Sequence, residues 1–199
     1  MADSATFSTV GLPAAPPARP RVALLGSTLV SAASAMFFAG LIGIYLARRA
    51  DVIASGETWL PDGVNIPVVP PTMMLITVGM SLITMAWSVT SLRSNDIPRA
   101  AIALGLTAVF AISVINQTSY LYTQMGLTID SEVGVLVYAI TGAHLVMVGA
   151  ALIFLGVVLF RAAAGQYRRI PDGPAAALVF WYTTCGIYAL IWYAIYITK

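Results

Sequence analysis

Residues 132–160, EVGVLVYAITGAHLVMVGAALIFLGVVLF, decide the fold of this chain. After Glu132 the stretch has no charged side chain, and His144 is its one titratable group at depth. An α-helix needs about 20 apolar residues to cross a hydrocarbon core roughly 30 Å thick. The stretch therefore predicts a transmembrane helix, with the Glu132 carboxylate at the positive end of the helix dipole.

Four further stretches are long and apolar enough for the same role, at residues 22–47, 71–92, 98–120 and 174–198. The composition agrees, because 59% of the residues are hydrophobic, 9% are charged and the mean hydropathy is +0.89. We therefore predict an all-α integral membrane bundle of five transmembrane helices over residues 22–199. Residues 1–21 lack an apolar core and are predicted to be a disordered tail, not a cleaved signal sequence.

The basic residues predict an orientation, because short cytoplasmic loops retain Lys and Arg. Seven arginines fall on the side of the N-terminus: Arg19, Arg21, Arg93, Arg99, Arg161, Arg168 and Arg169. Three basic residues fall on the other side: Arg48, Arg49 and Lys199. We expect the N-terminus in the cytoplasm, and the C-terminus and the long connection 48–70 outside.

Small residues predict where helices touch, because close backbone packing and interhelical hydrogen bonds hold helices together in lipid. One set recurs every four residues in the first helix: Ser27, Ser31, Ala35, Ala39 and Gly43. A second recurs every seven residues in the fourth helix: Gly142, Gly149 and Gly156. We interpret both sets as packing faces.

The membrane segments lack the residues that most intramembrane chemistry needs. No Asp, Glu, Lys or Arg lies near the middle of any segment, which argues against a proton relay, an ion-coupled pump or a voltage sensor. Cys185 is the one cysteine, so neither an internal disulfide nor a thiolate-rich metal site can form. The methionines are scattered, and no basic face for nucleic acid exists.

A few polar residues inside the helices are candidate functional residues. His144 could ligate a metal or haem, but one histidine is a poor ligand set, so a structural hydrogen bond is favoured. Asn116 and Gln117 could bind a polar ligand or bridge helices, and the second role is favoured. Tyr182 and Tyr188 are expected to hydrogen-bond to neighbouring helices.

The order of several short motifs resembles subunit III of the haem–copper terminal oxidases, the cytochrome c oxidase subunit III family, in a short five-helix bacterial form. The similarity covers nearly the whole chain. It rests on Met36-Phe37-Phe38-Ala39-Gly40, Tyr45, Ala47-Arg48, Trp59 and Pro61, Thr72 and Leu75, Gln117, Thr141-Gly142-x-His144 and the helix Trp181 to Lys199.

Several polar positions of the family pattern are replaced in this chain. Ser34 stands where the family has a glutamate before Met-Phe-Phe, and Tyr120 replaces an acidic residue. Met147 replaces the second histidine of the fourth helix, and the family's Trp-His pattern reads Trp181-Tyr182. These replacements argue against a proton-uptake or carboxylate-linked role.

The resemblance implies a non-catalytic accessory subunit in a bacterial plasma membrane. Such a chain binds no haem or copper, which the partner subunits I and II would carry, and it packs beside subunit I with phospholipids in a cleft. A respiratory supercomplex is a further candidate partner. The structural or lipid-cleft candidates are His144, Gln117, Asn116, Ser34, Tyr182 and Trp59.

Two alternatives remain open at the level of sequence. One is the equivalent accessory subunit of a nitric oxide reductase. The other is a stand-alone membrane transporter or assembly factor, in which Asn116, Gln117, Thr141 and His144 would line a path for a neutral solute.

Overall fold

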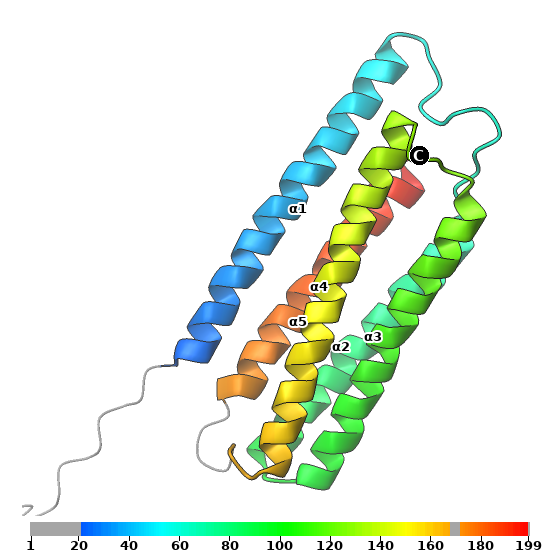
Figure 1. The fold of residues 1–199 in the computed structure, drawn as a ribbon. Coiled ribbons are helices and arrows are strands. Elements are labelled where there is room, and N and C mark those ends of the chain that lie inside the picture. The colour runs from blue at the N-terminus through cyan, green and yellow to red at the C-terminus, as the bar shows by residue number, and fades with distance from the viewer. Residues whose placement is uncertain (1–20, 168–171, 199) are drawn as a thin grey trace, which may run out of the picture.

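The computed structural model describes residues 21–167 and 172–198, and within them it contains helices and no strand. The helices are α1 (Val22–Ala54), α2 (Val69–Arg93), α3 (Ile97–Met125), α4 (Glu132–Ala163) and α5 (Asp172–Ile191), which continues as the π-helix η1 (Trp192–Ile197). Five helices are long and apolar enough to cross a membrane, and they run side by side (Figure 1). The predicted all-α fold class is confirmed. Most of the predicted N-terminal tail lies outside the described residues.

Two helices, α1 and α3, run well beyond the ends that the sequence predicts, by seven and five residues. α1 continues past Ala47 to Ala54, because charged residues such as Arg48 are good helix formers once the helix has left the hydrocarbon. α3 continues past Tyr120 and ends at Gly126, whose left-handed backbone (φ 65°) suits glycine. Its start is as expected from the sequence, because the Asp96 side chain caps it by accepting a hydrogen bond from the Arg99 N–H at 3.2 Å.

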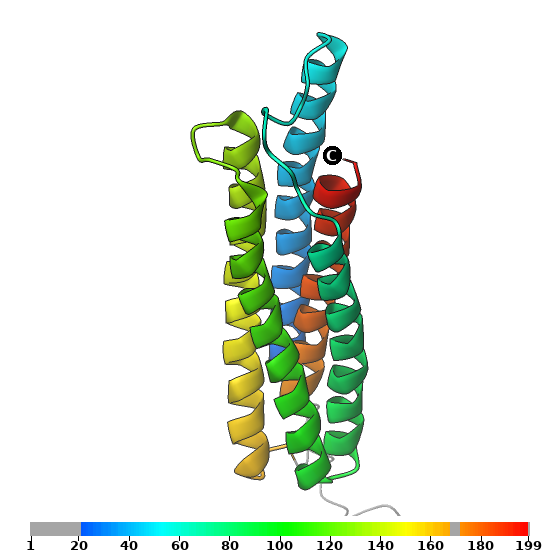
Figure 2. The ribbon, with the colours of Figure 1, turned by 90° about the vertical axis from the view of Figure 1, so that its right-hand side faces the viewer.

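The helix α5 lies at the centre of the bundle. It packs against α1, α2 and α4, whereas α2 and α3 form a long antiparallel pair beside it (Figures 1 and 2). α1 packs mainly on α5 and touches α4 over a shorter stretch. As a result α1 is the most exposed of the five, with most of its surface available to lipid.

The small-residue stripe of α1 packs within this chain over part of its length only. Ser27 and Ser31 are buried, whereas Ala35, Ala39 and Gly43 are exposed, so for these three the packing face stays a prediction. A four-residue step advances about 40° around a helix, so the stripe turns away from α5 within a few steps. The buried positions instead follow mixed steps of three, four and seven residues: Ser27, Ser31, Phe38, Ile42 and Tyr45. The α4 glycines of the second set, Gly142, Gly149 and Gly156, face open space within this chain.

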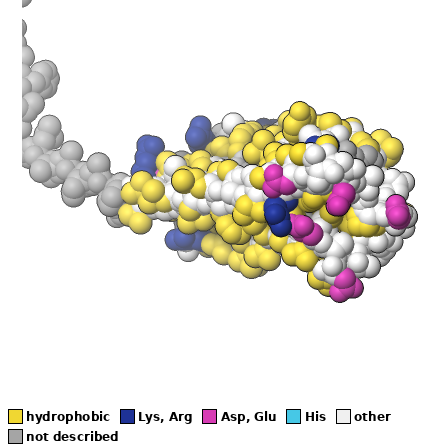
Figure 3. All heavy atoms as spheres, turned by 90° about the horizontal axis from the view of Figure 1, so that it is seen from above, with side chains coloured by type: hydrophobic (Ala, Val, Ile, Leu, Met, Phe, Trp, Pro, Cys, Tyr) yellow, Lys and Arg dark blue, Asp and Glu magenta, His cyan; other side chains and the backbone are white. Residues whose placement is uncertain are grey.

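The two ends of the bundle differ in charge. The end that carries the α1–α2 and α3–α4 loops, the acidic end, has five acidic residues, Asp51, Glu57, Asp62, Asp130 and Glu132, beside Arg48 and Arg49, and Figure 3 views the molecule from this side. Among the described residues the opposite end carries four arginines, Arg21, Arg93, Arg99 and Arg161, beside Asp96 and Asp172. The predicted orientation of the chain in the membrane rests on the unequal numbers of basic residues at the two ends.

Candidate lipid groove and its supporting contacts

An apolar groove lies between α1 and α4, with Phe180 of α5 at its floor. Its first part, about 430 Å³, is lined by Val22, Ala23, Gly26, Ser27, Val30, Ala150, Phe154 and Phe180. Its second part, about 460 Å³, is lined by Val30, Ser34, Phe37, Phe38, Ala143, Val146, Met147, Ala150 and Phe180. The two parts share Val30, Ala150 and Phe180, so they form one continuous groove.

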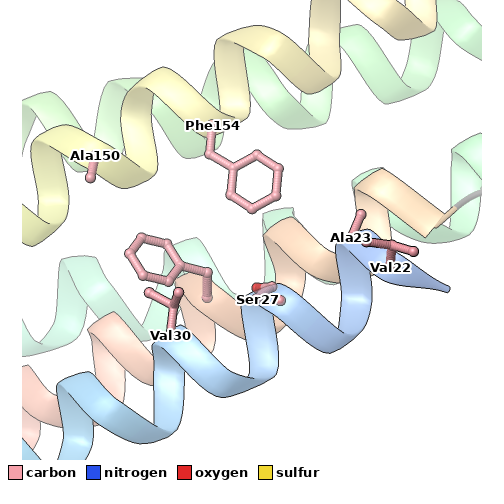
Figure 4. Close-up of a pocket in the computed structure, with 8 residues that line it drawn as sticks. Val22, Ala23, Ser27, Val30, Ala150 and Phe154 are labelled. Carbon is pink, nitrogen blue, oxygen red and sulfur yellow. The ribbon is translucent and has the colours of Figure 1, made fainter.

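The groove offers apolar surface and almost no reactive group. Figure 4 shows the Phe154 ring projecting from α4 into the space in front of α1. Ser27 is one of two hydroxyl residues in the lining, and its Oγ donates to the Ala176 carbonyl oxygen of α5 at 2.6 Å. Such a surface can hold a flexible hydrocarbon chain, but it supplies no acid, base or nucleophile.

Ser34, a candidate from the sequence, is the second hydroxyl residue of the lining. It is half-buried and stands where the resemblance places a glutamate. Met147, which replaces a histidine of the family pattern, lines the same part of the groove. Two of the replaced polar positions therefore face one apolar space, which makes the groove more suitable for hydrocarbon.

His144 joins α4 to α5 beside Phe38, a residue that lines the groove. Its side chain is 3% exposed, and Nε2 lies 3.1 Å from the Thr184 carbonyl oxygen. Because a carbonyl oxygen only accepts, Nε2 carries the proton and donates. The imidazole also packs against Phe38 and Tyr188, at ring-centroid distances of 6.3 and 5.5 Å. The side chain is thus held by three other residues from α1 and α5.

A line of hydrogen bonds ties α5 and η1 to α2. Tyr182, a candidate from the sequence, is partly exposed but donates to the Leu82 carbonyl oxygen at 3.1 Å. The other bonds run from Trp181 Nε1 to Ser81 Oγ at 3.1 Å, from Tyr188 to the Pro71 carbonyl oxygen at 2.8 Å, and from Trp192 Nε1 to Thr72 Oγ1 at 3.2 Å. Sequence analysis missed the partners of Trp181 and Trp192, because hydroxyl residues about one hundred positions away give no local signal.

Trp59 lies away from the groove, in the α1–α2 loop. It is buried, and its Nε1 donates to the Tyr45 hydroxyl at 3.1 Å while the two rings meet edge to face. The contact fastens the long loop to the outer part of α1. Trp59 is therefore placed to support the fold, and it does not line the groove.

Asn116 and Gln117 also lie away from the groove, on α3. Asn116 is exposed and Gln117 is half-buried, and neither side chain has a hydrogen-bond partner in the described ranges. Their predicted role in bridging helices stays a prediction. In residues 21–167 and 172–198 no three His, Cys, Asp or Glu side chains gather as metal ligands would.

Comparison with known proteins agrees with the motifs. Residues 21–199 match the family described as Cytochrome c oxidase subunit III. A cytochrome c oxidase subunit 3 from Corynebacterium diphtheriae is 26% identical over 184 residues, which cover 90% of this chain and 88% of that protein. The match favours the oxidase over the alternatives of a stand-alone transporter or assembly factor. With its five membrane helices and its similarity over nearly the whole length, this chain belongs to the cytochrome c oxidase subunit III family, whose members associate with other oxidase subunits and carry no redox centre themselves.

Proposed function

We propose that this chain is a non-catalytic accessory subunit that stabilises the catalytic subunit of a haem–copper oxidase and binds phospholipid in the groove between α1 and α4. Subunits I and II would hold the haem and copper and reduce oxygen. The proposal places the chain in a bacterial plasma membrane, with its N-terminus in the cytoplasm and its C-terminus outside.

The groove is the observation that carries the proposal. It runs along two membrane-crossing helices, its lining is apolar except for Ser27 and Ser34, and the floor is an aromatic ring. A phospholipid acyl chain matches this surface because it is apolar and flexible. No Asp, Glu, Lys or Arg lies near the middle of any membrane segment, which favours a chain that leaves proton movement to partner subunits.

Filling the groove tests lipid binding. Ala150 lines both parts of the groove, so Ala150→Phe should displace hydrocarbon from it. We expect less phospholipid per purified oxidase complex, measured by mass spectrometry of the extracted lipids. Ala139→Phe is the matched control, because Ala139 is also exposed on α4 and does not line the groove. Equal lipid content in both variants would contradict the proposal.

Removing the chain tests the accessory role. An oxidase prepared from a strain that lacks this chain should keep the haem spectrum of the partner subunits. It should lose thermal stability, because the partner's apolar surface loses this contact. Loss of the haem bands from an otherwise assembled partner complex would assign this chain a direct part in cofactor binding and would reject the proposal.

A further inference from the structure

The lining of the groove does not extend to the acidic end of the bundle. Its lining on α1 stops at Phe38, and its lining on α4 begins at Ala143. At this level the rings of Phe38 and His144 meet. About 15 Å further along α1, by the rise of the helix, Arg48 Nε lies 2.6 Å from Glu132 Oε1 of α4. The two helices are thus joined at the acidic end, beyond the lining of the groove.

We propose that Arg48 and Glu132 form a strap that holds the acidic ends of α1 and α4 together and so limits the separation of the two helices that line the groove. The strap crosses between two helices that otherwise share little contact. The other ion pair of the described residues, Arg99 with Asp96, lies within the first turn of α3 and joins no two helices.

Glu132 is rigidly placed for this role. Ser131 caps α4 by accepting a hydrogen bond from the Gly134 N–H at 3.0 Å. A Cβ on Gly134 would collide with the Thr128 carbonyl oxygen, so this tight loop requires glycine. Tyr138 also donates to the Leu127 carbonyl oxygen at 2.9 Å. The α3–α4 loop is therefore locked onto the first turns of α4, and the carboxylate cannot easily follow α1 if that helix moves.

Arg48 lies on the part of α1 that is least supported by α5. The last α1 residue buried in the bundle is Tyr45, one turn earlier, and the exposed fractions of the Arg48 and Glu132 side chains are 56% and 49%. A pair this exposed is weak and is screened by salt. The strap can therefore open, and opening would let the two helices that line the groove move apart at this end. The inference rests on the proposed function in one respect, namely that phospholipid occupies the groove.

A distance measurement between α1 and α4 tests the strap without reference to lipid. Spin labels on non-natural side chains at Ala50 and Ala139, both exposed, would report the separation of the acidic ends in the intact complex. Arg48→Gln and Glu132→Gln should each raise the population at longer distances roughly two- to five-fold, as expected for a half-exposed ion pair. Salt at about 1 M should produce the same shift in the wild type, and none beyond it in the variants.

Two controls make the test decisive. The reversed pair Arg48→Glu/Glu132→Arg should restore the short distance, and Arg99→Gln, which breaks the α3 pair, should leave it unchanged. The strap is rejected by unchanged distances in the single variants, by failure of the reversed pair, or by an equal effect of Arg99→Gln. Lipid content measured with Ala150→Phe can fail independently, so the two proposals are separable.

Discussion

The helices α1 and α5 are both long enough to cross a membrane, but they hold opposite positions in the bundle. α1 has the higher hydropathy, 2.0 against 1.5, yet only 17% of its apolar window is buried, against 50% for the helix that begins with α5. In water the more hydrophobic helix would be expected inside. In lipid an apolar side chain gains little by leaving the bilayer, so hydropathy does not select the central helix.

Hydrogen bonds distinguish the two helices instead. α5 and η1 bond to α2 through five side chains and to α4 through His144, whereas α1 bonds to α5 through Ser27 and to α4 through Arg48. α5 is therefore central because its Trp and Tyr side chains and its backbone carbonyl groups make more hydrogen bonds to other helices than α1 makes. α1 is left at the edge, where one side of it can border a groove.

The largest expected effect is the loss of a central aromatic residue. Trp181→Ala removes a side chain that is 2% exposed, together with its bond to Ser81. A large-to-small change of this kind costs about 3–5 kcal/mol. We expect little assembled complex, measured by its yield and melting temperature. Tyr193→Ala, at a side chain that is 59% exposed on the same segment, is the control, and a similar loss there would mean that α5 is not the centre.

Replacing glycine by alanine should have different effects at a tightly packed position of α4 and at an exposed position of α1. Gly134→Ala places a methyl group against the Thr128 backbone, and strain of this kind costs about 1–3 kcal/mol. Gly43→Ala meets no atom within 4 Å. The melting temperature should therefore fall for the first variant and stay near that of the wild type for the second. If Gly43→Ala destabilises the assembled complex, α1 contacts a partner subunit at that position.

His144→Ala should weaken the contact between α4 and α5 while leaving oxygen reduction intact. The lost hydrogen bond to the Thr184 carbonyl is worth about 0.6–2 kcal/mol in a membrane. Detergent titration of the purified complex should show earlier dissociation, and turnover per haem should stay close to the wild-type value. Near-total loss of turnover in a fully assembled complex would overturn this expectation.

The smallest expected effect concerns the outer part of α1. Tyr45→Phe removes only the acceptor for Trp59 Nε1 and keeps the ring contact. At about 0.6 kcal/mol the change should not alter assembly. It should increase limited proteolysis within residues 55–68, compared with Tyr120→Phe on an exposed part of α3. Equal cleavage in both variants would show that Trp59 does not fasten the loop.

The fold class could be predicted because a helix that crosses a bilayer needs a long apolar run, and no such run was ambiguous. Helix ends were harder. α1 passes Ala47 because hydropathy marks where the hydrocarbon ends, whereas the helix continues until the backbone changes conformation at Gly56 (φ 84°). Gly126 at the end of α3 was a usable signal for a C-terminal cap.

The groove could not be predicted from the sequence. Ser34 was a candidate only through the family resemblance, and its groove partners Val146 and Ala150 lie on another helix. The identity of an apolar residue in a membrane helix does not indicate whether its side chain faces a neighbouring helix, a groove or the bilayer. The polar residues were easier to single out, but Asn116 shows that a polar residue in a helix need not meet a partner in its own chain.

Purification of the tagged chain from native membranes in mild detergent tests the central claim most directly. A visible haem spectrum and mass spectrometry of the copurifying proteins would be recorded on the same sample. The account predicts haem bands together with oxidase subunits I and II in stoichiometric amounts. A haem-free chain that associates only with itself would contradict it.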